Sequence, residues 1–270
     1  MLKATVIAAF YNKIDYLRLV LAGFERQSEK AFEFIVADDG SKQEVISELE
    51  NLSEDLPFPL IHVWQEDRGF RKNKILNKAI TTANSNYIIF IDADCIPHSR
   101  FVEEHISYSE KGSCFTGRRV NLSQKYTQNL SPQKVRDGFI EKNNLELIKD
   151  GVFGDSFYVE KGFYLKNRLL RKIFNKKERG LLGCNFSLYK KEILNINGFD
   201  ERYEAPSIGE DSDVQFRLEL NGVKIVSLNH IAVQYHLYHK LLERSHENLA
   251  LFDKIKEDKV AFTPFGIIKN

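Results

Sequence analysis

The stretch Tyr87-Ile88-Ile89-Phe90-Ile91-Asp92-Ala93-Asp94 decides the fold of this chain. Its first five residues carry no charge, which is typical of a strand buried on both faces of a sheet. Because an unpaired charge is costly to bury, Asp92 and Asp94 are expected at the C-terminal end of the strand. Ligands bind at that edge of open α/β sheets, and two carboxylates there can hold a divalent cation. A solvated turn that closes the strand is the alternative for this stretch taken alone.

Strand and helix patterns alternate through the first hundred residues, which predicts a parallel sheet with helices on both faces. Strands are expected over residues 4–9, 34–37, 60–64 and 87–91, and helices over 14–26, 43–52 and 73–83. In the second half, strands are expected over 113–121, 223–228 and 231–235, and helices over 135–148, 165–174 and 209–220. The acidic clusters after the second and fourth strands then emerge at one edge of the sheet.

Composition narrows the class of protein. The chain has 270 residues, 43% of them hydrophobic, which suits one large α/β domain with an extension or two closely packed lobes. A net charge of +1 argues against bulk electrostatic binding of nucleic acid. Cys95, Cys114 and Cys184 form no CxxC pair, so we expect a cytoplasmic protein without a disulfide scaffold or a zinc site. The N-terminus lacks a signal-peptide pattern, and no apolar run approaches the ~18 residues that span a bilayer. Contact with a membrane would therefore be peripheral.

Two loops at the expected edge have the composition of nucleotide-binding segments. In Asp38-Asp39-Gly40-Ser41, Gly40 permits a tight turn and Ser41 is expected to cap the following helix. An acid in this loop can accept a hydrogen bond from the imide N–H of a nucleobase. The stretch after the third strand begins a helix, and its Arg68 and Lys74 suit a diphosphate. A turn and a basic helix start without any ligand are the alternatives.

Three further groups in the second half have candidate roles. Glu210-Asp211-Ser212-Asp213 begins a predicted helix, where acids complement the helix dipole but where a general base for a hydroxyl can also stand. His236 and His239 follow the last strand and can complete the coordination of a divalent ion, although lone histidines are more often structural. The basic cluster within residues 166–179 is interpreted as a solvated helix face, with an anionic acceptor or a membrane surface as alternatives.

Four motifs together resemble those of inverting family 2 glycosyltransferases with the GT-A fold. They are, in chain order, Asp38-Asp39-Gly40-Ser41, Asp92-Ala93-Asp94, Asn197-Gly198-Phe199-Asp200-Glu201 and Gly209-Glu210-Asp211. The resemblance covers roughly residues 3 to 240 and extends to bacterial capsular and lipopolysaccharide galactosyl- and N-acetylhexosaminyltransferases and to chondroitin-polymerase-like modules. It implies one α/β domain, in which residues 1–121 bind the nucleotide sugar. Residues 122–270 would then bind the acceptor, with a helical lid, the catalytic base and a C-terminal arm.

The resemblance also implies roles for single residues of the donor site. Asp38 would bind uracil, and Asp39 would shape the loop. Asp92 would contact the ribose or the metal, and Asp94 would be the main ligand of Mn²⁺ or Mg²⁺. Arg68 and Lys74 would face the diphosphate of the UDP-sugar.

On the acceptor side, the resemblance implies that Asp211 deprotonates the acceptor hydroxyl and that Glu210 holds a sugar. His236 would be the third protein ligand of the metal, with His239 as the competing choice. The chain departs from many galactosyltransferases at Ser207-Ile208-Gly209, where those enzymes carry a tryptophan, and this departure leaves the acceptor open. Glu210 and Asp213 are the alternatives for the base.

The implied reaction is transfer of a hexose or N-acetylhexosamine from a UDP-sugar to a growing saccharide, free or lipid-linked, in surface polysaccharide synthesis. Two alternatives belong to other classes. A sugar-nucleotide-forming nucleotidyltransferase would carry a Gly-rich loop after the first strand, where this chain reads Ala8-Ala9-Phe10-Tyr11-Asn12. A non-catalytic module with the GT-A fold would have lost acids among Asp92, Asp94 and Asp211, and all three are present.

Overall fold

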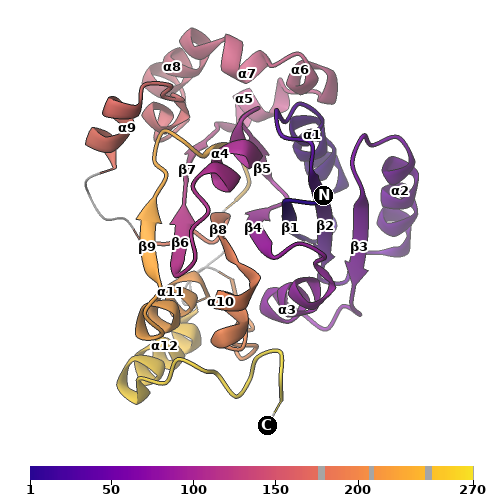
Figure 1. Ribbon diagram of the computed structural model, residues 1–270. Helices are drawn as coiled ribbons and strands as arrows, with labels where there is room; N and C mark the ends of the chain where they lie inside the picture. The colour runs from indigo at the N-terminus through magenta and orange to yellow at the C-terminus, as the bar shows by residue number, and fades with distance from the viewer. Residues whose placement is uncertain (176–179, 207–209, 241–244, 270) are drawn as a thin grey trace.

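The computed structural model describes the whole chain except residues 176–179, 207–209, 241–244 and 270 (Figure 1). It is built on a seven-stranded sheet with a three-stranded sheet beside it. In sheet order the seven strands are β3 (Leu60–Trp64), β2 (Phe32–Asp38), β1 (Ala4–Phe10), β4 (Tyr87–Asp92), β8 (Asn185–Tyr189), β6 (Ser113–Thr116) and β9 (Lys224–Ser227). Neighbouring strands pair in parallel, except that β8 runs antiparallel to β4 and β6. The predicted α/β fold with a mostly parallel sheet is confirmed.

Alternate residues of β1 pack in two hydrophobic cores, one on each face of the sheet. Val6 packs in one core with α1 (Ile14–Glu25) and α2 (Gln43–Glu54), whereas Ile7 packs in the other with α3 (Lys72–Thr82). A strand that is covered on both faces has no place for a charge along its length. Its polar residues therefore lie at its ends.

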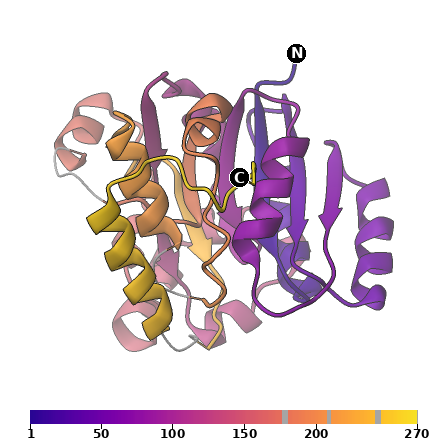
Figure 2. The same ribbon diagram turned by 90° about the horizontal axis from the view of Figure 1, so that it is seen from below.

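The other helices fill in the two faces and the periphery (Figures 1 and 2). They are α4 (Phe101–Ser107), α5 (Gln124–Gln128), α6 (Pro132–Arg136), α7 (Phe139–Lys142), α8 (Asn144–Phe153), the 3-10 helix η1 (Val159–Gly162), α9 (Arg168–Phe174), α10 (Lys190–Asn195), α11 (Glu210–Leu220) and α12 (His246–Asp258). The predicted single helix over 135–148 is wrong, because Gly138 takes a left-handed φ of 76° between α6 and α7. Across the described residues, no helix combines the length and the apolar character needed to cross a membrane.

The predicted continuous strand over 113–121 is also wrong, because the chain changes sheets at Gly117. β6 ends before this glycine, and β7 (Arg118–Asn121) after it belongs to the small sheet. A Cβ on Gly117 would lie 2.3 Å from the carbonyl oxygen of Ala232 and 2.4 Å from Oδ1 of Asn185. The crossing point is thus packed so closely that it has no room for a side chain.

The small sheet places β10 (Val233–His236), from the second half of the chain, next to the segment that follows β4. Its order is β5 (Cys95–Pro97), β10 and β7. β10 pairs antiparallel with β5, so that His236 lies opposite Cys95, and parallel with β7. A histidine late in the sequence is therefore held next to Asp94.

The Asn197–Glu201 motif serves as a dock for α3. The Asn77 side chain accepts a hydrogen bond from the N–H of Phe199 (2.8 Å) and donates one to the carbonyl of the same residue (2.9 Å). Asn73 donates to the carbonyl of Asp200 (2.7 Å). These bonds fix the helix whose N-terminus faces the ends of β1 and β4.

A buried ion pair holds α11 against the same motif. Arg217 donates to Asp213 Oδ2 (2.6 Å) and to the carbonyls of Ile196 and Gly198, and both charged side chains are almost fully buried. Asp213, an alternative for the base in the sequence analysis, is thus committed to a structural pair. Removal of one partner of such a pair would leave the other charge stranded in the core.

His105 on α4 is a fully buried polar residue in the middle of the fold. Its Nε2 lies 3.1 Å from Asn185 Oδ1, and its Nδ1 lies 2.7 Å from the hydroxyl of Ser187. The Asn185 amide nitrogen donates to two carbonyls, which identifies Oδ1 as an acceptor and places the imidazole proton on Nε2. Burial lowers the pKa of His105 to about 3, so the folded protein keeps this imidazole neutral.

We expect His105 to make folding stability sensitive to acid. The unfolded chain takes up a proton near pH 6.5, but the folded chain resists it until about pH 3. Stability from this residue is therefore complete above pH 6.5, and the free energy of unfolding falls by up to about 1.4 kcal/mol per unit below it. Urea unfolding between pH 7 and pH 5 measures the slope. His105→Gln, which cannot titrate, should have a shallower slope, and an identical slope would contradict the assignment.

Candidate active site

The first part of the site is the loop that follows β2. Asp38 lies opposite Phe10 of β1 and is fully buried. Its Oδ1 accepts hydrogen bonds from the backbone N–H (2.9 Å) and the hydroxyl (2.6 Å) of Ser41, and its Oδ2 lies 2.9 Å from His62 Nε2. The prediction that Ser41 caps α2 is wrong, because its hydroxyl is used by Asp38 and Lys42 is the N-cap residue. The buried carboxylate of Asp38 thus fixes the conformation of this loop through its hydrogen bonds.

Asp39 links this loop to the segment between β3 and α3. It accepts hydrogen bonds from the Gln65 side chain (2.6 Å) and from the backbone N–H of Arg71 (2.7 Å). Burial is the main reason that the pKa of Asp39 is raised, although these two hydrogen bonds oppose the shift. Gly40 has a φ of 99°, and a Cβ on it would lie 2.5 Å from the backbone of Asp67. The two loops are therefore in direct contact.

Tyr11 is a candidate site residue that sequence reasoning did not select. It directly follows β1, is 49% exposed, and donates a hydrogen bond to Asp67 Oδ2 (2.9 Å). The next residue, Asn12, accepts from the N–H of Lys42 and has a φ of 55°, so the β1 and β2 loops are joined. An exposed ring beside an acid offers a flat surface for a nucleobase. Its signal in the sequence is an aromatic residue directly after a buried strand.

The carboxylate at the end of β4 has a cationic partner that sequence reasoning passed over. Nζ of Lys72 lies 2.9 Å from Oδ1 of Asp92, and Asp92 lies opposite Ala9 of β1. Lys72 is the first residue of α3, where free backbone N–H groups also favour an anion. This pair connects the start of α3 to the acidic end of β4.

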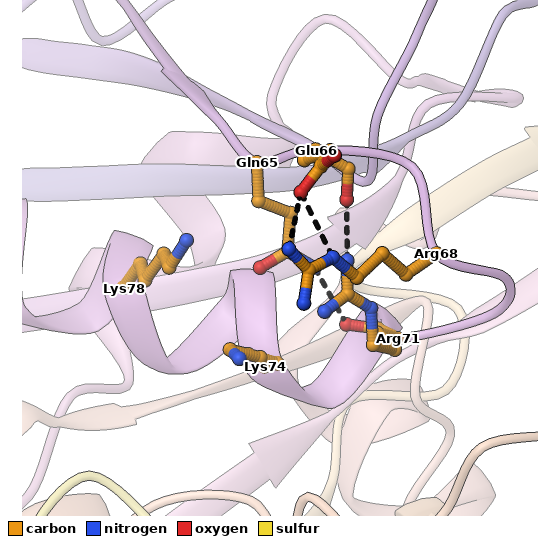
Figure 3. A pocket seen from close by; sticks show the side chains of 6 residues that line it. All are labelled: Gln65, Glu66, Arg68, Arg71, Lys74 and Lys78. Atoms are coloured by element: carbon orange, nitrogen blue, oxygen red, sulfur yellow. Dashed lines mark hydrogen bonds and ion pairs between the residues drawn. The ribbon is translucent and has the colours of Figure 1, made fainter.

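Arg68 and Lys74, the predicted diphosphate ligands, lie elsewhere on the same segment. They line a cavity of about 210 Å³ together with Gln65, Glu66, Arg71 and Lys78 (Figure 3). Arg68 forms an exposed ion pair with Glu66 (2.7 Å). Neither Asp92 nor Lys72 belongs to the lining of this cavity. Lys72 contacts Asp92 and Lys74 lines the cavity because the two lysines, two residues apart, lie on different sides of α3.

Asp94 meets both candidate histidines. Its Oδ1 lies 3.5 Å from His236 Nε2, its Oδ2 lies 3.3 Å from His239 Nε2, and the two Nε2 atoms are 3.1 Å apart. Burial alone would raise the pKa of Asp94, but its bonds to the two imidazoles hold that pKa well below its usual value. The same contact with Asp94 raises the pKa of His239. The structure thus brings Asp94 together with His236, the predicted third ligand, and with His239, the competing choice, whereas Asp92, also named as a ligand, pairs with Lys72.

Strand pairing and the backbone fix this cluster. The N–H of Leu237 donates to the carbonyl of Asp94 (2.9 Å), and the thiol of Cys95 lies 3.5 Å from Asp94 Oδ1. Donor atoms of Asp94, Cys95 and His236 lie within 4.8 Å of one another. A carboxylate and two imidazole nitrogens that converge at such distances form a donor set that fits a divalent cation.

Asp211, the predicted base, is the second residue of α11. Its Oδ2 accepts a hydrogen bond from the N–H of Gly183 (3.3 Å), and its Oδ1 accepts from the N–H of Ser212 (2.8 Å). It is partly exposed, so its carboxylate can reach a ligand. Glu210 begins α11, but its side chain lies outside what the structure describes.

Arg119 has Cys184, Cys95 and Asp92 as neighbours in the candidate site. Nη1 of Arg119 donates to the sulfur of Cys184 (3.1 Å), and Cys184 directly follows the Gly183 that holds Asp211. The interaction with Cys184, followed by those with Cys95 and Asp92, raises the pKa of Arg119. Arg119 is thus a fixed positive charge in the site. Sequence reasoning did not select it, because Arg119 stands within the stretch predicted as one long strand.

Comparison with known proteins agrees with this arrangement. The model of the family described as glycosyl transferase family 2 matches residues 5–194. A second model, described as the N-terminal domain of galactosyltransferase, matches residues 171–240, which include Asp211 and both histidines. Together these matches cover Asp92, Asp211 and the cluster around Asp94.

Individual relatives are similar at lower levels. The chain is 25% identical over 247 residues to the uncharacterized glycosyltransferase YfnE of Bacillus subtilis, covering 82% of this chain and 62% of that protein. It is 25% identical over 253 residues to a chondroitin synthase of Escherichia coli, covering 86% and 34%. The crystal structure of GalNAc-T7 with UDP, GalNAc and Mn²⁺ has a TM-score of 0.63 at 13% identity, covering 95% of this chain and 48% of that one. The chain therefore spans less than two thirds of each of these proteins.

Two glycines at positive φ test how closely the loops of the site are packed. Gly69 has a φ of 87°, but a Cβ there would have no described atom within 4 Å, whereas a Cβ on Gly40 would meet backbone at 2.5 Å. Gly69→Ala should lower the free energy of unfolding by about 1 kcal/mol through backbone strain alone. Gly40→Ala should cost about 3 kcal/mol or more, because the loop must also move away from Asp67. Equal losses in urea unfolding would show that the two loops are not in tight contact.

Proposed function

Because the chain belongs to glycosyl transferase family 2 and has the GT-A fold, we propose that it transfers a hexose or N-acetylhexosamine from a UDP-sugar to a saccharide hydroxyl, with inversion. One observation carries this proposal. Asp94, His236 and His239 converge at the end of β4, beside the Asp92–Lys72 pair. A nucleotide sugar needs a cationic surface for its diphosphate at that edge of the sheet.

In this proposal the β2 loop and Tyr11 bind the uracil. The sequence-based hypothesis gave the uracil to Asp38 and the shaping of the loop to Asp39. The burial of Asp38 and its three hydrogen bonds favour the reverse division. Asp39 then accepts from the uracil imide, next to the exposed ring of Tyr11. Each oxygen of Asp39 has one protein donor, which leaves a lone pair for a ligand.

Lys72 and Arg119 are proposed to face the diphosphate, because both have Asp92 as a charged neighbour. Asp92 would contact the ribose or share the metal. Arg68 and Lys74 are retained as an outer set of cations along the cavity of Figure 3, where they would attract the donor before it binds.

A divalent cation fits the cluster around Asp94. Asp94, His236 and His239 would hold it, and the mixed oxygen and nitrogen donors suit Mn²⁺ better than Mg²⁺, which prefers oxygen ligands. When bound, it would neutralise negative charge on the leaving diphosphate. The UDP and Mn²⁺ in the GalNAc-T7 structure of similar fold support this choice.

Asp211 is proposed as the general base. Its bond from Gly183 holds the carboxylate in place, and its exposure lets it accept the proton of an acceptor hydroxyl. The oxygen then attacks the anomeric carbon from the face opposite the diphosphate, which inverts the configuration. Glu210 would hold a sugar hydroxyl nearby. Residues 1–121 thus bind the nucleotide sugar, and residues 122–270 bind the acceptor and supply the base together with the two histidines of the metal site.

The acceptor is proposed to be a growing saccharide of a surface polysaccharide. The similarity to a chondroitin synthase, and to the model described as the N-terminal domain of galactosyltransferase, supports this class. A panel of nucleotide sugars would identify the sugar that is transferred.

The metal cluster predicts the effect of single substitutions on cation binding. Asp94→Ala should abolish Mn²⁺ binding in the presence of UDP, because it removes the carboxylate that both imidazoles face. His236→Ala and His239→Ala should each weaken it by about 10- to 100-fold. Titration followed by Mn²⁺ electron paramagnetic resonance measures the affinity. His246→Ala, an exposed histidine at the start of α12, is the matched control. If only one of the two histidine substitutions weakens Mn²⁺ binding, the ligand set contains one imidazole rather than two.

The donor and the base are tested in one experiment. The protein is incubated with a panel of nucleotide sugars and Mn²⁺, and release of the nucleotide is measured with and without saccharide acceptors. A UDP-sugar should be the preferred donor. With it, Asp211→Asn should lower kcat by about 10²- to 10⁴-fold, because the amide keeps the shape but loses the basicity. Donor affinity should stay nearly unchanged.

Three results would contradict this scheme. Equal turnover by Asp211→Asn and the wild type would exclude Asp211 as the base. A joint loss of donor binding and turnover would make Asp211 a binding residue and move the search to Glu210. No nucleotide release from any donor would leave the family assignment in place but remove the proposed activity.

A further inference from the structure

The helix α9 exposes an apolar stripe that the proposed transferase reaction does not use. The exposed fractions are 70% for Leu169, 42% for Leu170, 57% for Ile173 and 47% for Phe174. These four residues are adjacent on one side of a helix, at spacings of one, three and four. Both views place α9 at the outer edge of the molecule (Figures 1 and 2). An apolar stripe in this position is unusual for a helix that contacts only water.

The opposite side of α9 is fixed to the body of the protein. Arg171, the buried residue of the helix, donates to both carboxylate oxygens of Glu104 (2.9 and 2.7 Å) and to the carbonyl of Leu165 (2.6 Å). The Asn167 side chain caps its N-terminus. At the C-terminal end of the stripe, the ring of Phe174 also meets His230 edge-on at 5.0 Å. The helix is therefore anchored with its apolar stripe facing outward.

Basic side chains occupy the rest of the helix surface, beside and behind this stripe. Arg168, Arg171 and Lys172 line a cavity of about 570 Å³ together with Ser107, Tyr108 and Ser227. Arg171 is neutralised by Glu104, but Arg168 and Lys172 are exposed, and α9 contains no acid. The sequence continues with Lys176, Lys177 and Arg179, which lie outside the described residues. The charge next to the apolar stripe is thus positive.

We propose that α9 docks this protein on a bilayer that contains anionic phospholipid. Leu169, Leu170 and Ile173 enter the boundary between headgroups and acyl chains, and Arg168 and Lys172 meet lipid phosphates at the mouth of the cavity. An apolar stripe bordered by Lys and Arg is the pattern of helices that lie in the membrane interface. Charge complementarity selects an anionic surface over a neutral one. The sequence alternative of a fully solvated helix face does not account for four exposed apolar side chains.

Docking at α9 also bears on the acceptor. The chain runs from α9 to Gly183, whose N–H holds Asp211. A lipid-linked saccharide would then approach from the surface to which the enzyme is bound. The docking inference itself does not rest on the transferase activity, since it follows from the exposure and charge of α9 alone.

Vesicle binding without donor or metal tests the proposal. The purified protein is sedimented with vesicles of phosphatidylcholine alone or of phosphatidylcholine mixed with phosphatidylglycerol. We expect tighter binding to the anionic vesicles, by about tenfold or more at low salt, and weaker binding as salt is added. Arg168→Gln with Lys172→Gln should weaken it by about thirtyfold, since each cation near the surface contributes about fivefold. Leu169→Ser with Ile173→Ser should reduce binding to a similar extent.

Matched controls sit on exposed positions of other elements. Lys191→Gln with Lys224→Gln removes the same charge, and Leu194→Ser on α10 removes an exposed leucine. Both should bind like the wild type, and circular dichroism confirms that every variant is folded. Equal binding to neutral and anionic vesicles, or unchanged binding by the α9 variants, overturns the proposal. So does self-association that depends on Leu169 without vesicle binding, which would assign the stripe to a second copy of the chain. None of these results alters the test of the transferase.

Discussion

The parallel pairing of β1 with both β2 and β4 is the constraint on which the site depends. These strands are buried on both faces, so their charged residues are confined to the ends. The register then places Asp38 opposite Phe10 and Asp92 opposite Ala9, one acid on each side of β1. Two carboxylates that lie 54 positions apart in the sequence therefore face the same edge of one sheet. The loops after these strands, including the exposed ring of Tyr11, inherit their positions from this pairing.

Local pattern predicted this half of the molecule well, because short apolar runs and Gly-containing loops leave few arrangements for a parallel sheet. The strand over 60–64 has the predicted bounds, and β4 differs from its prediction by one residue. The sequence did not reveal the change of sheet at Gly117. The atom that excludes a side chain at this position is the carbonyl oxygen of Ala232, which is distant in the sequence. Nor did it select Lys72 over Lys74. Both are lysines at the start of one helix, and the contact with Asp92 depends on how α3 is rotated against the sheet.

The candidate site depends equally on the small sheet. β10 carries His236 into line with Cys95, and β7 places Arg119 next to Cys184. Donor-side acids thus come from the large sheet, and the imidazoles and the arginine come from the small one or its border. Motif spacing named the histidines and left the choice between them open. The structure shows both ring nitrogens near the same carboxylate, a geometry that arises from antiparallel pairing between segments far apart in the sequence.

The pairing of β10 with β5 also has a consequence for the order of synthesis. On the ribosome, β1 to β4 emerge long before β10, the strand that carries His236. A nascent chain that ends before β10 contains the complete β2 loop, Asp92 and Asp94, but Asp94 still lacks its imidazole neighbours. The cluster of Asp94, His236 and His239 can therefore be completed only after translation has passed β10.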